Sequence, residues 1–271
     1  MKKALLLLAI LGLGLAACGQ KTPGSTGSTT PSAVPQGGPA AIEKVATTTQ
    51  ESGAEGSDRA DPTLERVAAM PEAGQLPGGR WKAGVHYRPI VPAQTTSAEP
   101  GQVEVLEVFW YGCSHCYALD PYLEGWSKSK PSYVKFVRMP VMWGPAHRAH
   151  GRLFYTLQAL GKLDALHSVA FDEIQKRGNL LVDSDEGKTA RLQLAFAKAH
   201  GISEADFTRE YNGFFVNSNL QRAEDLGRRY KVEGVPLVII NGKYETDVGM
   251  AGGQEQLIQL ISDLSATEKK R

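Results

Sequence analysis

Two cysteines in the middle of the chain have the type and spacing to do chemistry. Cys113 and Cys116 enclose Ser114 and His115, and residues three apart share a helical face, so the two sulfurs can form a disulfide. A Cys-x-x-Cys pair between a strand and a helix is typical of redox motifs. The free N–H groups of the first helical turn and the helix dipole stabilise a reactive thiolate on Cys113. We expect a working redox pair; the alternative is an inert buried disulfide.

The residues around the pair predict the elements that position it. Residues 103–111 are apolar on both faces, as in a buried parallel strand, and this run stops at Gly112. Residues 114–128 have helical spacing, and residues 133–139 indicate a second buried strand. A strand-helix-strand unit within one sheet implies that the two strands are parallel.

The pattern then changes to helices and returns to strands. Five helices are expected at residues 146–160, 163–176, 185–200, 204–211 and 218–230. Two strands and a last helix are expected at 237–240, 244–248 and 253–264. Asn241-Gly242 is a hairpin signal between those strands, and Pro89 confines a strand at 85–90 to a sheet edge. The order indicates an α/β fold, a β-α-β…β-β-α mixed sheet with an inserted all-helical subdomain.

The N-terminal region has the pattern of an export signal. Two lysines precede fourteen apolar or small residues at 4–17, a run too short to span a membrane. The sequence Leu-Ala-Ala-Cys that ends at Cys18 resembles the lipobox of bacterial lipoproteins, in which the cysteine carries the lipid. Gly19, rather than Asp, follows it, which favours the outer membrane. An ordinary signal with an incidental cysteine is the alternative.

Composition limits the other classes of function. Residues 19–61 are rich in Gly, Ser, Thr and Pro and cannot bury enough apolar surface to fold, so we expect a disordered tether. The 30 Lys and Arg residues balance 29 Asp and Glu residues, which argues against nucleic-acid binding. Three cysteines are too few for a disulfide scaffold.

Taken together, these features resemble the thioredoxin superfamily and, more narrowly, the DsbA-type thiol:disulfide oxidoreductases. The resemblance covers residues 81–264. Four features match the family: the helical insertion, the export signal, and two motifs, Glu107-Val-Phe-Trp-Tyr-Gly-Cys113-Ser-His115-Cys116 and Gly234-Val235-Pro236. The predicted divisions are 1–17 for the signal peptide, 18–79 for the lipidated cysteine and tether, 80–141 and 213–271 for the halves of a thioredoxin-like domain, and 142–212 for the insertion.

The resemblance implies a role for each matching residue around the pair. Cys113 corresponds to the nucleophile and Cys116 to the second, more buried cysteine. His115 can donate a hydrogen bond or positive charge to the Cys113 thiolate and so stabilise the reduced form. Ser114 departs from the more common Pro, which puts the size of the redox potential in doubt. Glu107 corresponds to a buried acid that assists proton transfer at Cys116.

Further residues are assigned by the resemblance or by the strand pattern. The Val235–Pro236 bond is cis in the family, Pro236 faces the cysteine pair, and the backbone of Val235 receives an extended substrate. Glu104, on the strand face opposite to that of Glu107, is expected at the surface. A set of apolar side chains could extend the substrate surface or belong to the core: Trp110, Tyr111, Tyr117, Met142 and Trp143.

The implied function is a periplasmic enzyme that donates its Cys113–Cys116 disulfide to reduced or unfolded exported proteins. It needs no cofactor besides that disulfide, is held to a membrane by its lipid, and depends on a DsbB-type membrane reoxidase. A same-fold isomerase or reductase and a non-catalytic anchored chaperone are the alternatives. The cysteine pair with His147 and His150 could form a zinc site, but the histidine spacing argues against it. Haem attachment is excluded because Tyr117 follows Cys116.

Overall fold

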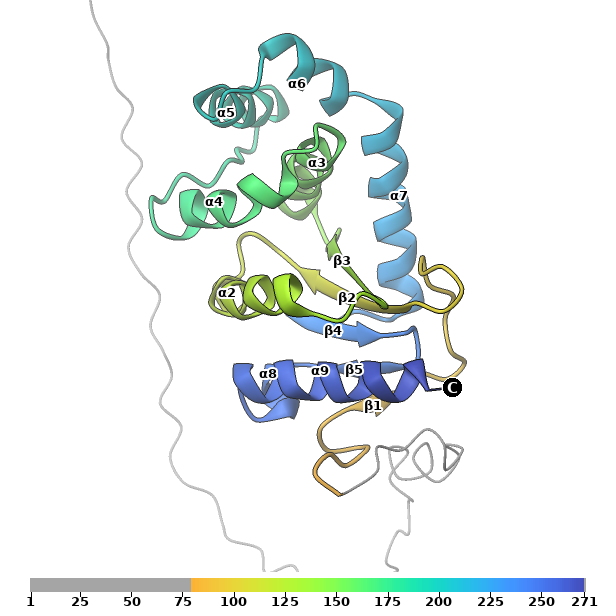
Figure 1. The fold of residues 1–271 in the computed structure, drawn as a ribbon. Coiled ribbons are helices and arrows are strands. Elements are labelled where there is room, and N and C mark those ends of the chain that lie inside the picture. The colour runs from red at the N-terminus through yellow and green to blue at the C-terminus, as the bar shows by residue number, and fades with distance from the viewer. Residues whose placement is uncertain (1–78, 271) are drawn as a thin grey trace, which may run out of the picture. The chain divides into compact units, whose positions relative to one another are not determined.

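A five-stranded mixed sheet organises the part of the chain that the structure, a computed structural model, describes: residues 79–270. The predictions for the signal peptide, Cys18 and most of the tether lie outside these residues. The strands are β1 (Arg88–Pro89), β2 (Val103–Phe109), β3 (Val134–Pro140), β4 (Leu237–Ile240) and β5 (Tyr244–Thr246). Their order is β1-β5-β4-β2-β3, with β2 parallel to β3 and antiparallel to β4. The predicted α/β fold is confirmed (Figure 1).

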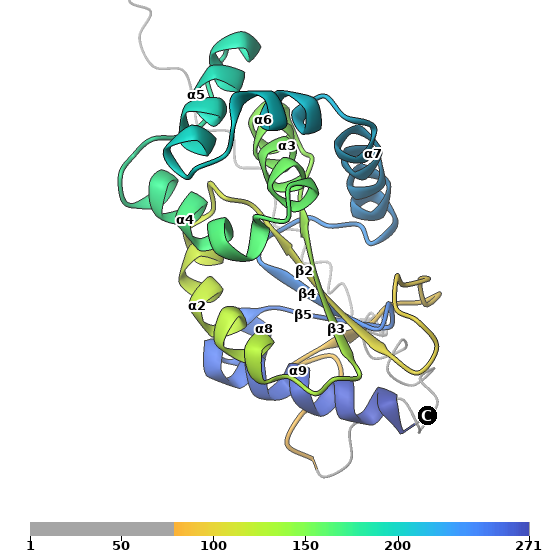
Figure 2. The same cartoon turned by 45° about the horizontal axis from the view of Figure 1, so that its top comes forward.

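The helices cover the two faces of this sheet unequally (Figures 1 and 2). Helices α2 (Ser114–Ser129), α8 (Val248–Ala251) and α9 (Gln254–Lys269) pack on one face. The other face meets the helices of the predicted insertion, α3 (Pro145–Ala159), α4 (Leu163–Gln175), α5 (Glu186–Ala199) and α6 (Glu204–Tyr211), together with α7 (Phe214–Arg229) from the predicted second half of the domain. Alternate β2 side chains enter two cores, Val103 and Val105 on the α2 side and Leu106 and Val108 on the other. This explains why β2 is apolar on both faces.

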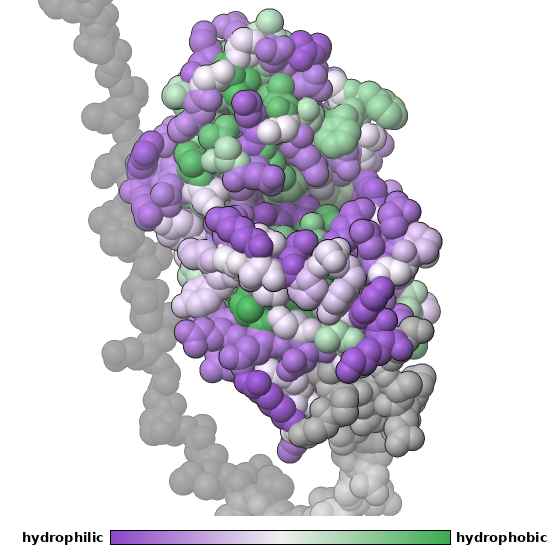
Figure 3. Space-filling view, in the orientation of Figure 1, coloured by the Kyte–Doolittle hydropathy of each residue, from purple (hydrophilic) through white to green (hydrophobic). Residues whose placement is uncertain are grey.

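The strand expected at 85–90 is only the two-residue β1, and the strand expected to reach residue 111 ends at Phe109. Three other predicted boundaries were wrong for local reasons. The strand expected to reach residue 248 ends at Thr246, because Asp247 caps α8 by accepting a hydrogen bond from the N–H of Met250. Helix α7 starts four residues earlier than predicted, in an apolar patch where Phe214 is 88% and Phe215 42% exposed (Figure 3). These exposed aromatics do not fit the apolar period of the helix. The last helix continues to Lys269, where Glu268 binds the Asn241 turn.

Two predictions of burial were also wrong. Strand β3 was expected to be buried, but it is an edge strand whose four central residues are only half-buried. Glu104 was expected at the surface, but it is 5% exposed. The loop before β2 covers it, and both the N–H and the hydroxyl of Ser97 donate to its Oε2, the former at 2.7 Å. A buried carboxylate is tolerated because these donors satisfy it. The edge position predicted for Pro89 is confirmed.

No helix within residues 79–270 is both long and apolar enough to cross a membrane.

Candidate active site

Cys113 lies where β2 has ended and α2 begins, as the N-cap residue of α2. Its Sγ accepts a hydrogen bond from the N–H of Cys116 at 3.3 Å, and it lies 3.6 Å from the carbonyl oxygen of Val235, to which the thiol donates. Cys113 is half-buried, whereas the Cys116 side chain is fully buried, and both are free thiols. One sulfur is therefore accessible to a reaction partner and the other is not.

The surroundings give the two thiols opposite acidities. The pKa of Cys113 falls to about 6, chiefly because the Cys116 side chain donates a hydrogen bond to its sulfur, against the effect of burial. The backbone N–H groups of Cys116 and His115 and the charge of His115 lower it further. The pKa of Cys116 is raised, first by that same hydrogen bond and then by burial. At neutral pH the dithiol therefore carries its negative charge on Cys113.

The loop that precedes β4 closes the site on its other side. The Val235–Pro236 peptide bond is cis, as the resemblance implies. The carbonyl of Val235 lies against the Cys113 sulfur, so the backbone of this loop is placed beside the reacting atom. An extended peptide that paired with this backbone would bring its own sulfur to Cys113.

Glu107 lies on β2 and is fully buried. Its Oε2 accepts a hydrogen bond from Nε of Arg138 at 2.9 Å, whereas its Oε1 has no hydrogen-bond partner among the described residues. Burial raises the pKa of this carboxyl to about 7, even though Arg138 opposes the shift. The charge of Glu107 also raises the pKa of Cys116. Glu107 can thus hold or release a proton near neutral pH beside the buried cysteine.

Arg138, which the sequence analysis did not single out, is the centre of a buried charge network. Its guanidinium binds Glu107, contacts Oε1 of Glu124 at 2.8 Å and lies 3.6 Å from Oδ1 of Asp120. Nε2 of His167, from the helical subdomain, lies 3.4 Å from the same Asp120 oxygen. One arginine thus offsets three carboxylates, of which Glu107 also acts on Cys116.

The far end of this network joins the insertion to the active-site strand. Nδ1 of His167 lies 3.0 Å from the hydroxyl of Tyr111, and the hydroxyl of Ser168 donates to Asp120 at 2.6 Å. The burial of His167 lowers its pKa, against the pull of Asp120. Asp120 in turn has a lowered pKa despite its burial, because His167, Ser168 and Arg138 stabilise its charge.

Comparison with known proteins decides the family. A model of the DsbA-like thioredoxin domain matches residues 134–265. The thiol:disulfide interchange protein DsbA of Pseudomonas syringae pv. tomato is 40% identical over 172 residues, which cover 64% of this chain and 78% of that protein. The corresponding protein of Pseudomonas aeruginosa is 36% identical, with 64% and 79% covered. The superposition on the crystal structure of Pseudomonas aeruginosa DsbA covers 70% of this chain and 95% of the crystallised chain, with a TM-score of 0.64 at 35% identity.

The chain belongs to the DsbA family. It is therefore a thiol:disulfide oxidoreductase. In this DsbA-family chain Cys113, Cys116, Glu107 and the cis-proline loop come together, as the sequence motifs indicate. His115 belongs to the same end of α2 and lines the groove beside the pair.

The apolar candidates separate into core and surface. Tyr111 is fully buried, whereas Trp143 is 49% exposed and donates its indole N–H to the carbonyl of Val232 at 3.2 Å. The ring of His147 stacks near Trp110 at 4.3 Å between centroids, and Nε2 of His150 lies 2.8 Å from the carbonyl oxygen of Leu180. Within residues 79–270, no group of three or more His, Cys, Asp or Glu side chains is arranged to hold a metal ion.

Only one signal could have revealed the charge network from sequence. Arg138 and Lys135 are the two charged residues of β3, and the parallel register sets Arg138 directly beside Glu107. Two opposite charges on adjacent parallel strands form a natural pair. The parts played by Asp120 and His167 depend on how α2 and α4 pack, which no local pattern in the sequence specifies.

Proposed function

We propose that this chain is a lipid-anchored periplasmic enzyme that donates its Cys113–Cys116 disulfide to reduced exported proteins. The observation that carries the proposal is the pairing of an acidic, accessible Cys113 thiol with a buried Cys116 of raised pKa. A stable Cys113 thiolate favours the reduced enzyme, so the oxidised enzyme gives up its disulfide readily. The names of its relatives support the same class of reaction.

The transfer has two exchange steps. A client thiolate attacks Sγ of Cys113, the Cys113–Cys116 bond breaks, and the electron pair leaves on Cys116. Glu107, with a pKa of about 7, supplies the proton that converts the Cys116 thiolate to a thiol. A second client thiolate then attacks the client sulfur of the mixed disulfide and expels the Cys113 thiolate. Two electrons pass from the client to the enzyme, and the client gains one disulfide.

Each assigned side chain has a distinct part in this scheme. His115 stabilises the leaving Cys113 thiolate by its charge and its backbone N–H. The cis loop at Val235 and Pro236 holds the client backbone in extended form beside the sulfur. A membrane reoxidase of the DsbB type returns the pair to the disulfide after each turnover.

The test is oxidation of reduced ribonuclease by catalytic amounts of the oxidised enzyme in a glutathione buffer. The wild type should restore ribonuclease activity over many turnovers, and Cys113→Ser should abolish this. Stoichiometric protection without turnover would instead identify an anchored chaperone, and undiminished oxidation by Cys113→Ser would refute the mechanism.

The anchor is tested separately in cells. Labelled palmitate should be incorporated into the full chain and not into Cys18→Ala, and the labelled protein should fractionate with the outer membrane. Unchanged membrane association of Cys18→Ala would contradict the lipid anchor but leave the redox function standing.

A further inference from the structure

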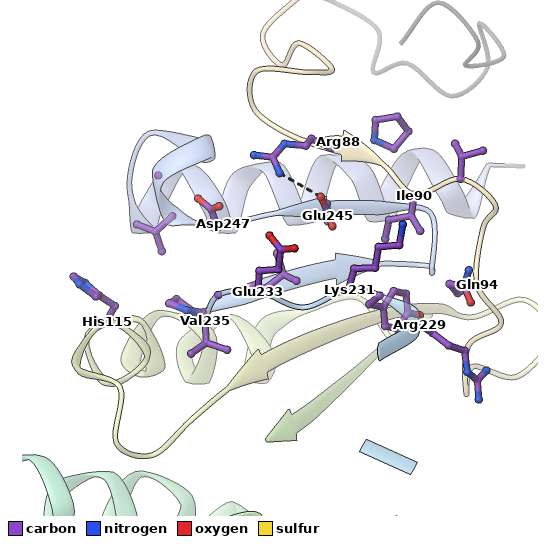
Figure 4. A pocket seen from close by; sticks show the side chains of 18 of the residues that line it. Arg88, Ile90, Gln94, His115, Arg229, Lys231, Glu233, Val235, Glu245 and Asp247 are labelled. Carbon is purple, nitrogen blue, oxygen red and sulfur yellow. Dashed lines mark hydrogen bonds and ion pairs between the residues drawn. The ribbon is translucent and has the colours of Figure 1, made fainter. Parts of the chain in front are cut away.

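A groove of about 800 Å³ continues from the active site along the cis-proline loop (Figure 4). One wall is the loop that carries Lys231, Glu233 and Val235, and the opposite wall is formed by β1 and β5. His115 lies at the end beside the cysteines, and Gln94 lies at the far end. The groove therefore leads away from the position where a client sulfur would react.

Charges of opposite sign follow one another along the loop wall. Lys231 and Glu233 are exposed, and both reach into the groove because Val232 between them is buried in the core. Among residues 79–270, neither side chain takes part in an ion pair. Glu233 lies nearer the active site, and Lys231 lies farther from it (Figure 4).

The other charged groups of the groove reinforce this order. Asp247 lies at the active-site end, where its carboxylate caps α8, and Arg229 lies at the far end beside Lys231. Arg88 and Glu245 on the opposite wall neutralise one another at 3.4 Å. His115 also lies at this end, so the two carboxylates of Glu233 and Asp247 face one basic side chain there. The unneutralised charge is thus negative near the cysteines and positive beyond.

We propose that this groove selects clients by charge order, favouring a basic residue near the reactive cysteine and an acidic residue farther along the same side. The inference rests on the proposed disulfide donation. Same-face side chains of an extended segment repeat every two residues, at about 6.6–7 Å. Val235, Glu233 and Lys231 follow one another along the groove, with Lys231 in a turn of positive φ (51°) (Figure 4). A client whose cysteine lies beside Val235 therefore has its second residue on the side of Glu233 and its fourth residue farther along, toward Lys231.

The main chain and the side chains of the loop then have different roles in recognition. Backbone pairing at Val235 holds any extended segment, whereas the charges discriminate between segments. Each exposed charge pair adds little, so the preference should be modest, about three- to tenfold for two pairs together. It should fade in 1 M salt, where the screening length is about 3 Å.

The probes are synthetic peptides with two cysteines that differ only in charge order. One set carries Lys two residues and Asp four residues from the target cysteine, and the matched set exchanges them. Each set is made in two versions, with both charges before the cysteine or both after it. For each enzyme, kcat/KM for oxidation is compared within a matched pair. On one side of the cysteine, the wild type should favour the Lys-then-Asp peptide about three- to tenfold.

The decisive variant exchanges the two charges of the loop. Lys231→Glu combined with Glu233→Lys keeps the net charge and should reverse the preference. The matched control, Lys198→Glu with Glu204→Lys, exchanges an exposed ion pair of 3.0 Å on the helical subdomain and should leave the preference unchanged. Because each ratio is taken within one enzyme, altered overall activity does not affect it. If the double exchange fails to fold, Glu233→Gln should reduce the preference.

The outcomes separate this inference from the proposed function. Equal oxidation of matched peptides by the wild type, or a preference that the double exchange leaves in place, would overturn charge selection while disulfide donation stands. If the wild type oxidises none of the peptides, and reduced ribonuclease is not oxidised either, the proposed function itself fails.

Discussion

Replacing Glu107 by Gln should stabilise the reduced enzyme, and the gain should depend on pH. Glu107 is fully buried, and burial raises its pKa from 4.5 to about 7. The protonated carboxyl is therefore the form that the fold accepts, and its contribution to stability is complete below pH 4.5. That contribution is lost as the pH rises through 7, because the folded protein must then hold the charge. Gln has nearly the shape of the protonated acid and is neutral at every pH, so the variant keeps this contribution to stability at every pH.

The size of the gain follows from the two pKa values. Each unit of difference is worth about 1.4 kcal/mol, so the variant should exceed the wild type by about 2 kcal/mol at pH 6 and about 3 kcal/mol at pH 8. At pH 4 the difference should nearly vanish. Arg138 keeps two carboxylate partners in the variant, Glu124 and Asp120, so it is not left without a counter-ion.

Urea unfolding of the reduced protein at pH 4, 6 and 8 measures this difference directly. Glu124→Gln is the matched control: it removes a carboxylate from the same arginine, but one whose side chain is 22% exposed, and it should give no gain at pH 8. A gain for Glu107→Gln that is equal at all three values, or a loss of stability at pH 8, would refute the assignment of a raised pKa to Glu107.

Two further results are expected from the same site. Alkylation of the reduced enzyme by iodoacetamide should follow a midpoint near pH 6, and Cys116→Ala should move it upward more than His115→Ala, because the Cys116 side chain is the largest cause of the lowered pKa of Cys113; equal midpoints for both variants would contradict this order. Arg138→Met should lower the free energy of unfolding by about 3–5 kcal/mol at pH 7, since Asp120 loses its cation and Glu107, which then stays protonated, loses its hydrogen-bond donor. Urea titration measures the loss, and a change under about 1 kcal/mol would show that the network contributes little.

The sheet and the cysteine pair could be predicted because their signals are local. Strand β2 begins at the predicted residue, and α2 begins at Ser114, because an apolar β-branched run stops at Gly112 and Cys113 can cap the helix. The insertion was predicted from its helical periodicity. Phe214 and Phe215 show the limit of that method, since they begin α7 without facing the core.

The charge network and the groove could not be predicted because they depend on packing between distant segments. Glu104 and Glu107 stand three apart on β2, and only the fold shows that a loop covers the first while Arg138 neutralises the second. His167 reaches Asp120 only because α4 packs beside α2. The role proposed for Lys231 and Glu233 likewise depends on β1 and β5, which form the facing wall of the groove.

The most direct test of the central claim is the equilibrium between the Cys113–Cys116 disulfide and a series of glutathione buffers. A Cys113 thiolate stabilised at pH 7 should make the pair more oxidising than thioredoxin, with a potential well above about −270 mV. Such a value would establish the enzyme as a donor of disulfides. A potential at or below that of thioredoxin would contradict the account and identify a reductase that depends on a reducing partner.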